Sequence, residues 1–223
     1  RDQAGVKYGL HSASFVNAAE IEPTVRKAVQ QHLIDYVELA HQLEAEYVVL
    51  HFGYHFSLFM DHVFDCLIKT YTPVVELAEK YKLPIGIENM NKIHDEAEIA
   101  YLGVTVEEIG RVLNAIPSKY FGLTLDIAHA SLLPGGPESF IDAFPDRIIS
   151  THVSDNDLIL DHHLPVGNGK IDFKRVFENL MKVNFKGTLN IELPRSNEDR
   201  ALSKRRLEPI LAELGILQEA LKP

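Results

Sequence analysis

The sequence of 223 residues lacks several features that define common classes of protein. It has one cysteine, Cys66, so no disulfide can form within the chain and a cytoplasmic location is expected. No apolar run approaches the roughly 20 residues that a membrane-spanning helix requires, so no membrane partner is predicted. No Gly-X-Gly-X-X-Gly motif follows the first predicted strand, which weakens the case for a dinucleotide-binding fold.

Basic residues are scarce relative to acidic ones. Lysine and arginine number 22 against 32 aspartates and glutamates, and the formal net charge is −10. Nucleic acids attract clustered lysine and arginine, so this balance argues against a nucleic-acid partner. The densest basic run is SKRR, residues 203–206, which we interpret as the solvated face of a helix.

Six short apolar runs without polar alternation predict strands that are buried on both faces, as in a parallel sheet. Helical patterns lie between them, Thr105 and Glu108 have the spacing of a capping box, and Asp172 is a predicted N-cap. The alternation predicts an α/β fold, and the lack of a linker predicts one domain over residues 1–223. The predicted strands are residues 6–10, 47–50, 84–87, 121–125, 147–151 and 187–191, and the helices are residues 23–43, 66–81, 105–116 and 172–183. The pattern of the first helix places on one face the residues Val25, Val29, Leu33, Tyr36, Val37 and Ala40.

Each predicted strand ends at a residue that can bind a metal or move a proton. In a barrel the C-terminal ends of parallel strands open on one face, whereas an open sheet spreads them along a line. The pattern therefore favours a (β/α)₈ TIM barrel. Imidazoles mixed with carboxylates suit Zn²⁺, Mn²⁺ or Co²⁺ rather than Ca²⁺. These residues are His11, His51, Glu88, Asp126, His152 and Glu192.

A second polar group follows the fifth strand. Asp161 and His163 are two residues apart, so in an extended segment they lie on one side and suit capture of a single ion, with His162 pointing away. Gly167 and Gly169, in the sequence VGNG, would let the backbone pass close to a ligand.

The motifs LHSAS, LHFGYH, GIEN, LTLDIAHA, THVSDND, DHHLPVGNGKIDF and GTLNIEL occur in this order between residues 6 and 193. As an ordered set they resemble the xylose isomerase-like TIM barrels, which include sugar and sugar-phosphate isomerases and epimerases and endonuclease IV. For the isomerase branch the resemblance implies proton transfer by Glu88 and Glu192 through a metal-stabilised enediolate. His129 would then contact a sugar or sugar phosphate. The implied ligands of its single divalent ion are Glu88, Asp126, His152 and Glu192.

For the endonuclease IV branch the resemblance implies hydrolysis of abasic DNA by up to three zinc ions, with Glu88 bridging. The additional ligands would be His11, His51, His129, Asp161 and His163. The chain is acidic, its loops are short, and Ser14 and Phe15 stand near the place of that branch's large aromatic residue. We therefore expect an isomerase or epimerase. A non-catalytic metal- or ligand-binding barrel is a third alternative.

Two further residues and the strand count complete the expectations. Arg195 is expected to neutralise a phosphate or carboxylate of the substrate, and Asn89 to orient Glu88 or contact the substrate. A barrel needs eight strands. We therefore expect the first strand–helix unit to be truncated or absent, and a short strand to lie between His152 and Gly187. The substrate, the number of ions and the oligomeric state stay open.

Overall fold

The computed structural model describes residues 6–13, 15–56, 58–93, 97–194 and 196–216. Its internal contacts divide the chain into two compact units, residues 1–124 and 125–223. The single domain expected from the sequence stays a prediction. Arg195, the expected substrate ligand, lies outside the described residues, as does Ser14.

Parallel strands form the centre of the first unit. They are β1 (Leu10–His11), β2 (Val48–His51), β4 (Ile85–Glu88) and the beginning of β6 (Phe121–Asp126). They pair in that order, and β2 and β4 are buried at every position. Full burial explains why these strands appear in the sequence as continuous apolar runs. Two short strands that were not predicted, β3 (Tyr54–His55) and β5 (Ala100–Tyr101), pair antiparallel beside them.

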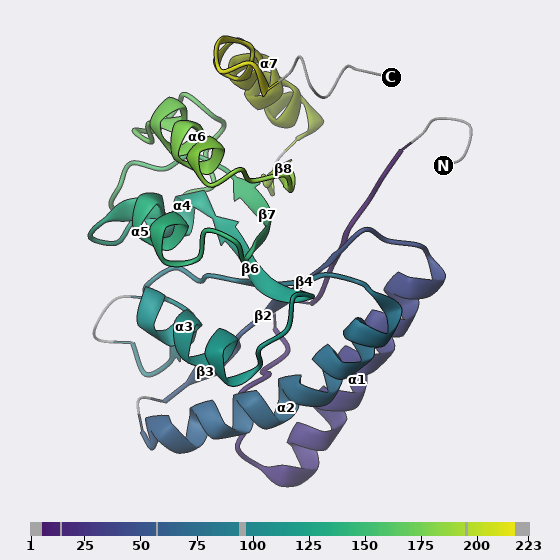
Figure 1. The fold of residues 1–223 in the computed structure, drawn as a ribbon. Coiled ribbons are helices and arrows are strands. Elements are labelled where there is room, and N and C mark those ends of the chain that lie inside the picture. Colours follow the sequence, from purple (N-terminus) through teal and green to yellow (C-terminus); the bar gives the residue numbers. More distant parts are fainter. Residues whose placement is uncertain (1–5, 14, 57, 94–96, 195, 217–223) are drawn as a thin grey trace. The chain divides into compact units, whose positions relative to one another are not determined.

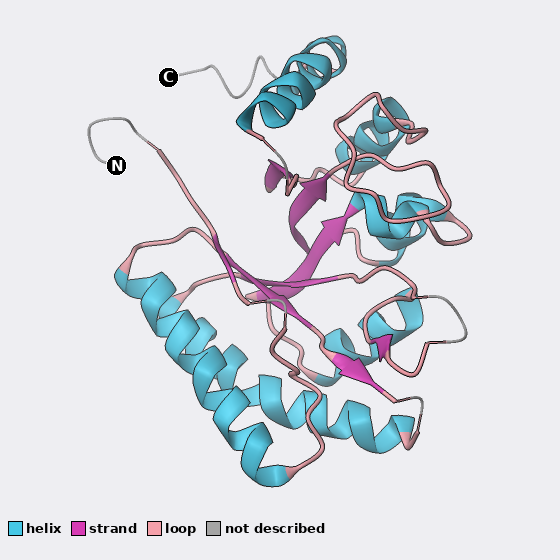
Figure 2. Cartoon of the chain, turned by 180° about the vertical axis from the view of Figure 1, so that it is seen from behind, coloured by secondary structure: helices cyan, strands magenta, loops and turns pink. Residues whose placement is uncertain are grey.

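Three helices belong to the first unit: α1 (Pro23–Gln42), α2 (Met60–Tyr81) and α3 (Val106–Ala115). The helices α1 and α2 pack side by side in both views (Figure 1, Figure 2). The predicted capping box at the start of α3 is confirmed, with both the Thr105 and the Glu108 side chain bonded to backbone amides. The predicted apolar face of α1 reaches the core through Leu33 and Val37, whereas Val25, in the first turn, is 49% exposed.

The second unit holds the end of β6 and the parallel pair β7 (Ile148–Val153) and β8 (Thr188–Ile191). Its helices are α4 (Ile127–Ser131), α5 (Gly136–Ala143), α6 (Phe173–Lys182) and α7 (Asn197–Glu213). Asp172 caps α6 as predicted, because its side chain accepts from the backbone N–H of Arg175. Of the described helices in both units, none is long and apolar enough to cross a membrane.

The strand expected between His152 and Gly187 is wrong. The described segment between β7 and β8 makes one isolated antiparallel bridge, Asp155 with Leu164, and then continues into α6. Several of its amide groups bond to the Asp155 side chain and so do not take part in a strand ladder. The sheet order therefore passes directly from β7 to β8.

The basic run, residues 203–206, lies in α7 as expected, but only half of it is a solvated face. Lys204 and Arg205 are exposed. Ser203 is fully buried, and Arg206 bonds to the backbone of Val166. This part of the interpretation is therefore wrong, because two of the four side chains hold another segment of the same unit.

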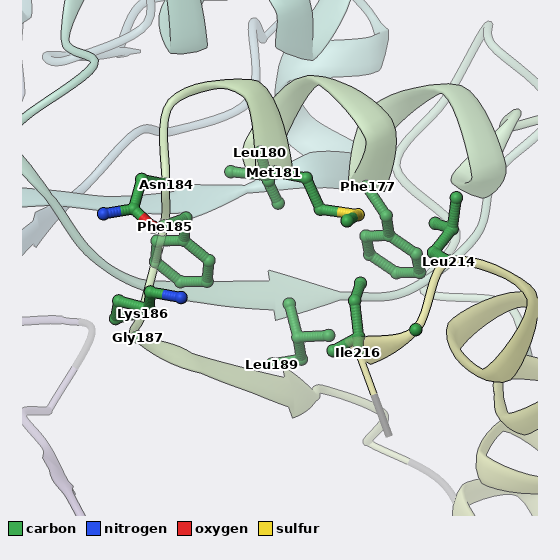
Figure 3. Close-up of a pocket in the computed structure, with 11 residues that line it drawn as sticks. Phe177, Leu180, Met181, Asn184, Phe185, Lys186, Gly187, Leu189, Leu214 and Ile216 are labelled. Carbon is green, nitrogen blue, oxygen red and sulfur yellow. The ribbon is translucent and has the colours of Figure 1, made fainter. Parts of the chain in front are cut away.

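An apolar pocket of about 530 Å³ lies between α6, the beginning of β8 and the end of α7 (Figure 3). Phe177, Leu180 and Met181 of α6 face Leu189 and Ile216 across it. Its lining residues include no carboxylate or imidazole, and it opens at the amino end of β8, whereas Glu192 follows the carboxyl end. None of the strand-end residues predicted to bind a metal or move a proton therefore lines this pocket.

Candidate active site

The first unit brings two imidazoles to one buried carboxylate. The register of the parallel pair β2–β4 places His51 opposite Glu88. Glu88 Oε2 lies 2.8 Å from His51 Nε2 and 3.2 Å from His11 Nε2, and the Glu88 side chain is 2% exposed. The three residues stand at the ends of β1, β2 and β4. The strand ends therefore meet as the sequence pattern predicts, within this unit.

The hydrogen bond of His11 Nδ1 determines which ring nitrogen faces Glu88 without a proton. His11 Nδ1 lies 2.8 Å from the carbonyl oxygen of Ser12, which can only accept, so Nδ1 carries the proton. In a neutral ring, Nε2 and the Glu88 carboxylate oxygen are then both acceptors, and a cation between them could be bound by both. Among the described residues, His51 Nδ1 has no hydrogen-bond partner. An imidazole that donates through one nitrogen and leaves the other for a cation is typical of metal ligands.

Two tyrosines fix the main chain of these histidines. The Tyr36 hydroxyl of α1 donates to the carbonyl oxygen of His11, and the Tyr71 hydroxyl of α2 donates to that of His51 at 2.5 Å. Burial raises the pKa of Tyr71, so its hydroxyl keeps the proton that it donates. No separate sequence signal points to these roles, since Tyr36 is recognisable only as part of the apolar face of α1.

In the second unit, Asp126, His152 and Glu192 converge at the ends of β6, β7 and β8. His152 Nδ1 lies 2.9 Å from Glu192 Oε2 and 3.9 Å from Asp126 Oδ2. Asp126 is fully buried and His152 is 4% exposed. Asp126 Oδ1 accepts the backbone N–H of His129 at 2.8 Å, which caps α4 and fixes the carboxylate. Two acids and one imidazole thus surround a common point, as in sites for divalent cations.

A second cluster in this unit consists of His129, Asp161 and His163. Asp161 Oδ2 lies 3.2 Å from both His129 Nε2 and His163 Nε2. One ligand atom from each of the three residues lies within 4.8 Å of the others. Asp161 Oδ1 is buried, and no hydrogen-bond partner for it lies in the part of the chain that the structure describes. The donor set and the unsatisfied oxygen fit a bound cation.

Hydrogen bonds and charge interactions with the imidazoles shift the pKa of Asp161, and Asp161 shifts that of His163. Burial alone would raise the pKa of Asp161, but hydrogen bonds from His129 and His163 outweigh it and hold that pKa well below its ordinary value. The hydrogen bond to Asp161 raises the pKa of His163 to about 9, against the lowering effect of burial. Without an ion, proton charge on the His163 imidazole therefore compensates the carboxylate.

Two other predicted residues differ in what the structure shows of them. His162 turns to Asp157, with 3.4 Å between Nε2 and Oδ2, and takes no part in the cluster. Asn89 is fully buried at the end of β4, where its backbone N–H donates to Thr124, and its role toward Glu88 or substrate stays a prediction.

A family model covers nearly the whole chain, including all the strand ends described above. The family model described as xylose isomerase-like TIM barrel matches residues 1–219. The chain belongs to this family. The fold class predicted from the sequence is thereby confirmed.

Three similar proteins extend the comparison. An uncharacterized protein of Methanocaldococcus jannaschii is 34% identical over 199 residues, which cover 86% of this chain and 66% of that protein. A D-tagatose 3-epimerase-like protein of known structure is 32% identical, with a TM-score of 0.87 over 99% of this chain and 82% of its own. The IOLI protein, whose structure holds a zinc atom, is 18% identical, with a TM-score of 0.75 over 92% of this chain and 76% of its own. The chain thus spans just under two thirds of the length of the curated relative.

Proposed function

We propose that the chain is the metal-binding part of a sugar or sugar-phosphate isomerase or epimerase that moves a proton on the carbon next to a carbonyl group. The observation that carries the proposal is the convergence of Asp126, His152 and Glu192 at three successive strand ends. The family match and the similarity to a D-tagatose 3-epimerase-like protein support the class of reaction.

In the proposal, Glu88 of the first unit and the three residues of the second unit are the ligands expected for one divalent cation, Zn²⁺, Mn²⁺ or Co²⁺. The bound ion would supply Lewis-acid stabilisation to negative charge on the substrate oxygens. Asp126 is fixed by its bond to the backbone of α4, so it is a rigid ligand. His152 contacts Glu192 directly, so it can hold the carboxylate in one orientation.

Glu192 is the group that we propose to transfer the proton on one side of the substrate. Its side chain is 35% exposed, whereas that of Glu88 is 2% exposed, so Glu192 is accessible to a ligand from solvent. A carboxylate that contacts an imidazole and reaches solvent can both accept and return a proton. Glu88 is proposed as the second acid–base group, and His129, Asn89 and Arg195 as substrate contacts.

The test is exchange of substrate hydrogen with solvent. A panel of ketopentoses, ketohexoses and their phosphate esters is incubated with metal-loaded protein in deuterium oxide, and proton NMR follows loss of the signal at the carbon next to the carbonyl. Exchange should occur for at least one sugar and fall by a factor of about 100 or more in Glu192→Gln, the range of a lost acid–base group. Glu198→Gln, in the exposed first turn of α7, is the matched control. Full exchange in Glu192→Gln would remove Glu192 from the mechanism.

A second candidate function is hydrolysis of phosphodiesters, and the cluster of His129, Asp161 and His163 favours it. A second site of this kind suits the multi-metal hydrolysis of phosphate esters. The acidic net charge of −10 speaks against a DNA substrate. If this function is correct, an abasic duplex should be nicked by the zinc-loaded wild type and left intact by Asp161→Ala. Absence of nicking by the wild type would rule it out.

A further inference from the structure

Asp155 is a buried acid that none of the proposed chemistry uses. It lies two residues beyond the end of β7 and is 1% exposed. Its Oδ2 accepts the backbone N–H of Gly167 at 2.8 Å and of Gly169 at 2.9 Å. Its Oδ1 accepts those of Ile171 at 3.1 Å and of Asn156 at 2.9 Å. Four amide donors thus surround one carboxylate, an arrangement that stabilises an irregular loop strongly.

The two glycines of the VGNG sequence allow the backbone to approach the Asp155 carboxylate closely. A Cβ atom on Gly169 would lie 2.2 Å from the backbone oxygen of Asn156 and 2.3 Å from Asp155 Oδ1. Gly167 has a φ of +81°, which L-residues with side chains rarely adopt. From the sequence we expected the glycines to let the backbone pass close to a ligand. In the structure the backbone passes close to the Asp155 carboxylate instead.

The same loop carries two proposed metal ligands. Asp155 and Leu164 exchange two backbone hydrogen bonds, of 2.8 and 2.7 Å, so the segment between them is closed at its base. Asp161 and His163 stand on this closed segment, and His163, next to Leu164, has a φ of +44°. The position of His163 therefore depends on a backbone conformation that the loop must impose.

Helix α7 holds the loop from the other side. The Ser203 hydroxyl accepts the backbone N–H of Val166 at 3.0 Å. Arg206 Nη1 donates to the carbonyl oxygen of Val166 at 2.6 Å and to Asn168 Oδ1 at 2.7 Å. Two residues of the basic run therefore bind the turn that follows the ligand segment.

We propose that Asp155, together with Ser203 and Arg206, is a positioning device that holds Asp161 and His163 in the geometry required to bind a divalent cation with His129. Ordering a loop costs conformational entropy, and bonds to a charged acceptor compensate that cost before the ion arrives. This inference rests on the proposed metal-binding role of the cluster. The three residues bond to the loop itself and would act through it.

The test measures zinc affinity. Asp155→Asn keeps the shape of the side chain but replaces an acceptor oxygen with a donor, and it should weaken the zinc binding that depends on His163 by 10–100-fold, as is usual for residues behind metal ligands. Asp142→Asn, which removes an equal charge from the exposed surface of α5, is the control and should bind zinc as the wild type does. Titration calorimetry with zinc alone gives the affinities, and His163→Gln defines the His163-dependent part.

A milder pair of variants covers the case in which Asp155→Asn does not fold. Arg206→Gln should weaken the same zinc binding, whereas Arg205→Gln, its exposed neighbour, should not. In the chelated protein, hydrogen exchange at the amides of Gly167 and Gly169 should be at least about tenfold faster in Asp155→Asn, since a bond to a charged acceptor is lost. These readouts need no substrate, so they are independent of the deuterium exchange that tests the enzyme activity.

A double-variant comparison separates positioning from general destabilisation. If Asp155 acts through His163, Asp155→Asn should cause no further loss of zinc affinity in a His163→Gln background. Wild-type zinc affinity in both Asp155→Asn and Arg206→Gln would overturn the inference. So would zinc binding by the wild type that does not depend on His163.

Discussion

At the scale of single residues, buried acids and imidazoles lie in contact, and each buried carboxylate without such a partner would destabilise the fold. A buried carboxylate costs several kcal/mol unless it is paired and hydrogen-bonded. Glu88 receives two imidazoles on one oxygen, and Asp161 also contacts two. For the Asp161–His163 pair, the proton on His163 makes the stability of the folded chain depend on pH.

The raised pKa of His163 gives the first prediction. Its pKa rises from 6.5 to about 9 on folding, so its protonation stabilises the folded state fully below pH 6.5. This contribution declines above pH 6.5 and is lost as the pH passes 9. In chelated protein, the difference in melting temperature between wild type and His163→Gln should therefore be largest below pH 6.5 and vanish above 9. A difference that stays constant from pH 6 to pH 10 would contradict the assigned Asp161–His163 pair.

Tyr71 gives the second prediction. In Tyr71→Phe the buried carbonyl of His51 loses its donor, which should lower the free energy of unfolding by about 1–3 kcal/mol. Urea denaturation measures the change. The matched control is Tyr81→Phe at the other end of α2, because Tyr81 stacks on His41 with 3.9 Å between ring centroids. An equal effect of both substitutions would show that the Tyr71 hydroxyl is unimportant.

At the scale of elements, several helices are fixed at their start by a side chain that accepts a backbone N–H of the first turn, as α3, α4, α6 and α7 show. Asp126 caps α4 and is also a proposed ligand, so the helix start and the site share one carboxylate. The start of α3 depends instead on the reciprocal bonds of Thr105 and Glu108. Caps of this kind set where a helix begins and how its first turn is oriented.

The cap of α3 gives the third prediction. Thr105→Ala should lower the free energy of unfolding by about 0.5–2 kcal/mol, because the backbone N–H of Glu108 loses its acceptor. Thr105→Ser keeps the hydroxyl and should stay close to the wild type. Chemical denaturation of both variants measures the two changes in the free energy of unfolding. Equal losses in both would mean that packing of the threonine methyl group matters rather than the cap.

At the scale of the whole molecule, the main elements could be predicted from the sequence, but the irregular segments could not. Five of the six predicted strands and all four predicted helices occur, because buried parallel strands and amphipathic helices have clear periodicity. The first predicted strand, residues 6–10, is mostly wrong, since only Leu10 of it belongs to β1 and Val6 is 57% exposed. The helices α4 and α5 are short, and β3 and β5 have two residues each, so no period identifies them. A strand was expected after β7 because a barrel needs eight strands. Nothing in the sequence shows that the amide groups there donate to the Asp155 side chain instead.

The positions of the candidate ligands could be predicted for a related reason. A position at the end of a strand can be read from the sequence, and Glu88 and Asp126 occupy such positions. The residues that we propose to hold the candidate ligands in place, such as Tyr71 and Asp155, bond to backbone groups of distant segments. Their contacts depend on the tertiary structure, so spacing along the chain carries no signal for them.

The most direct test of the account is the metal content of the protein. After saturation with zinc or manganese and removal of free ions, elemental mass spectrometry should find about one tightly bound ion per chain for an isomerase, or about three for a phosphodiesterase. Asp126→Ala and His152→Ala should lose the tightly bound ion. A wild-type chain that retains no more metal than these two variants would contradict the claim that the strand ends hold a divalent cation.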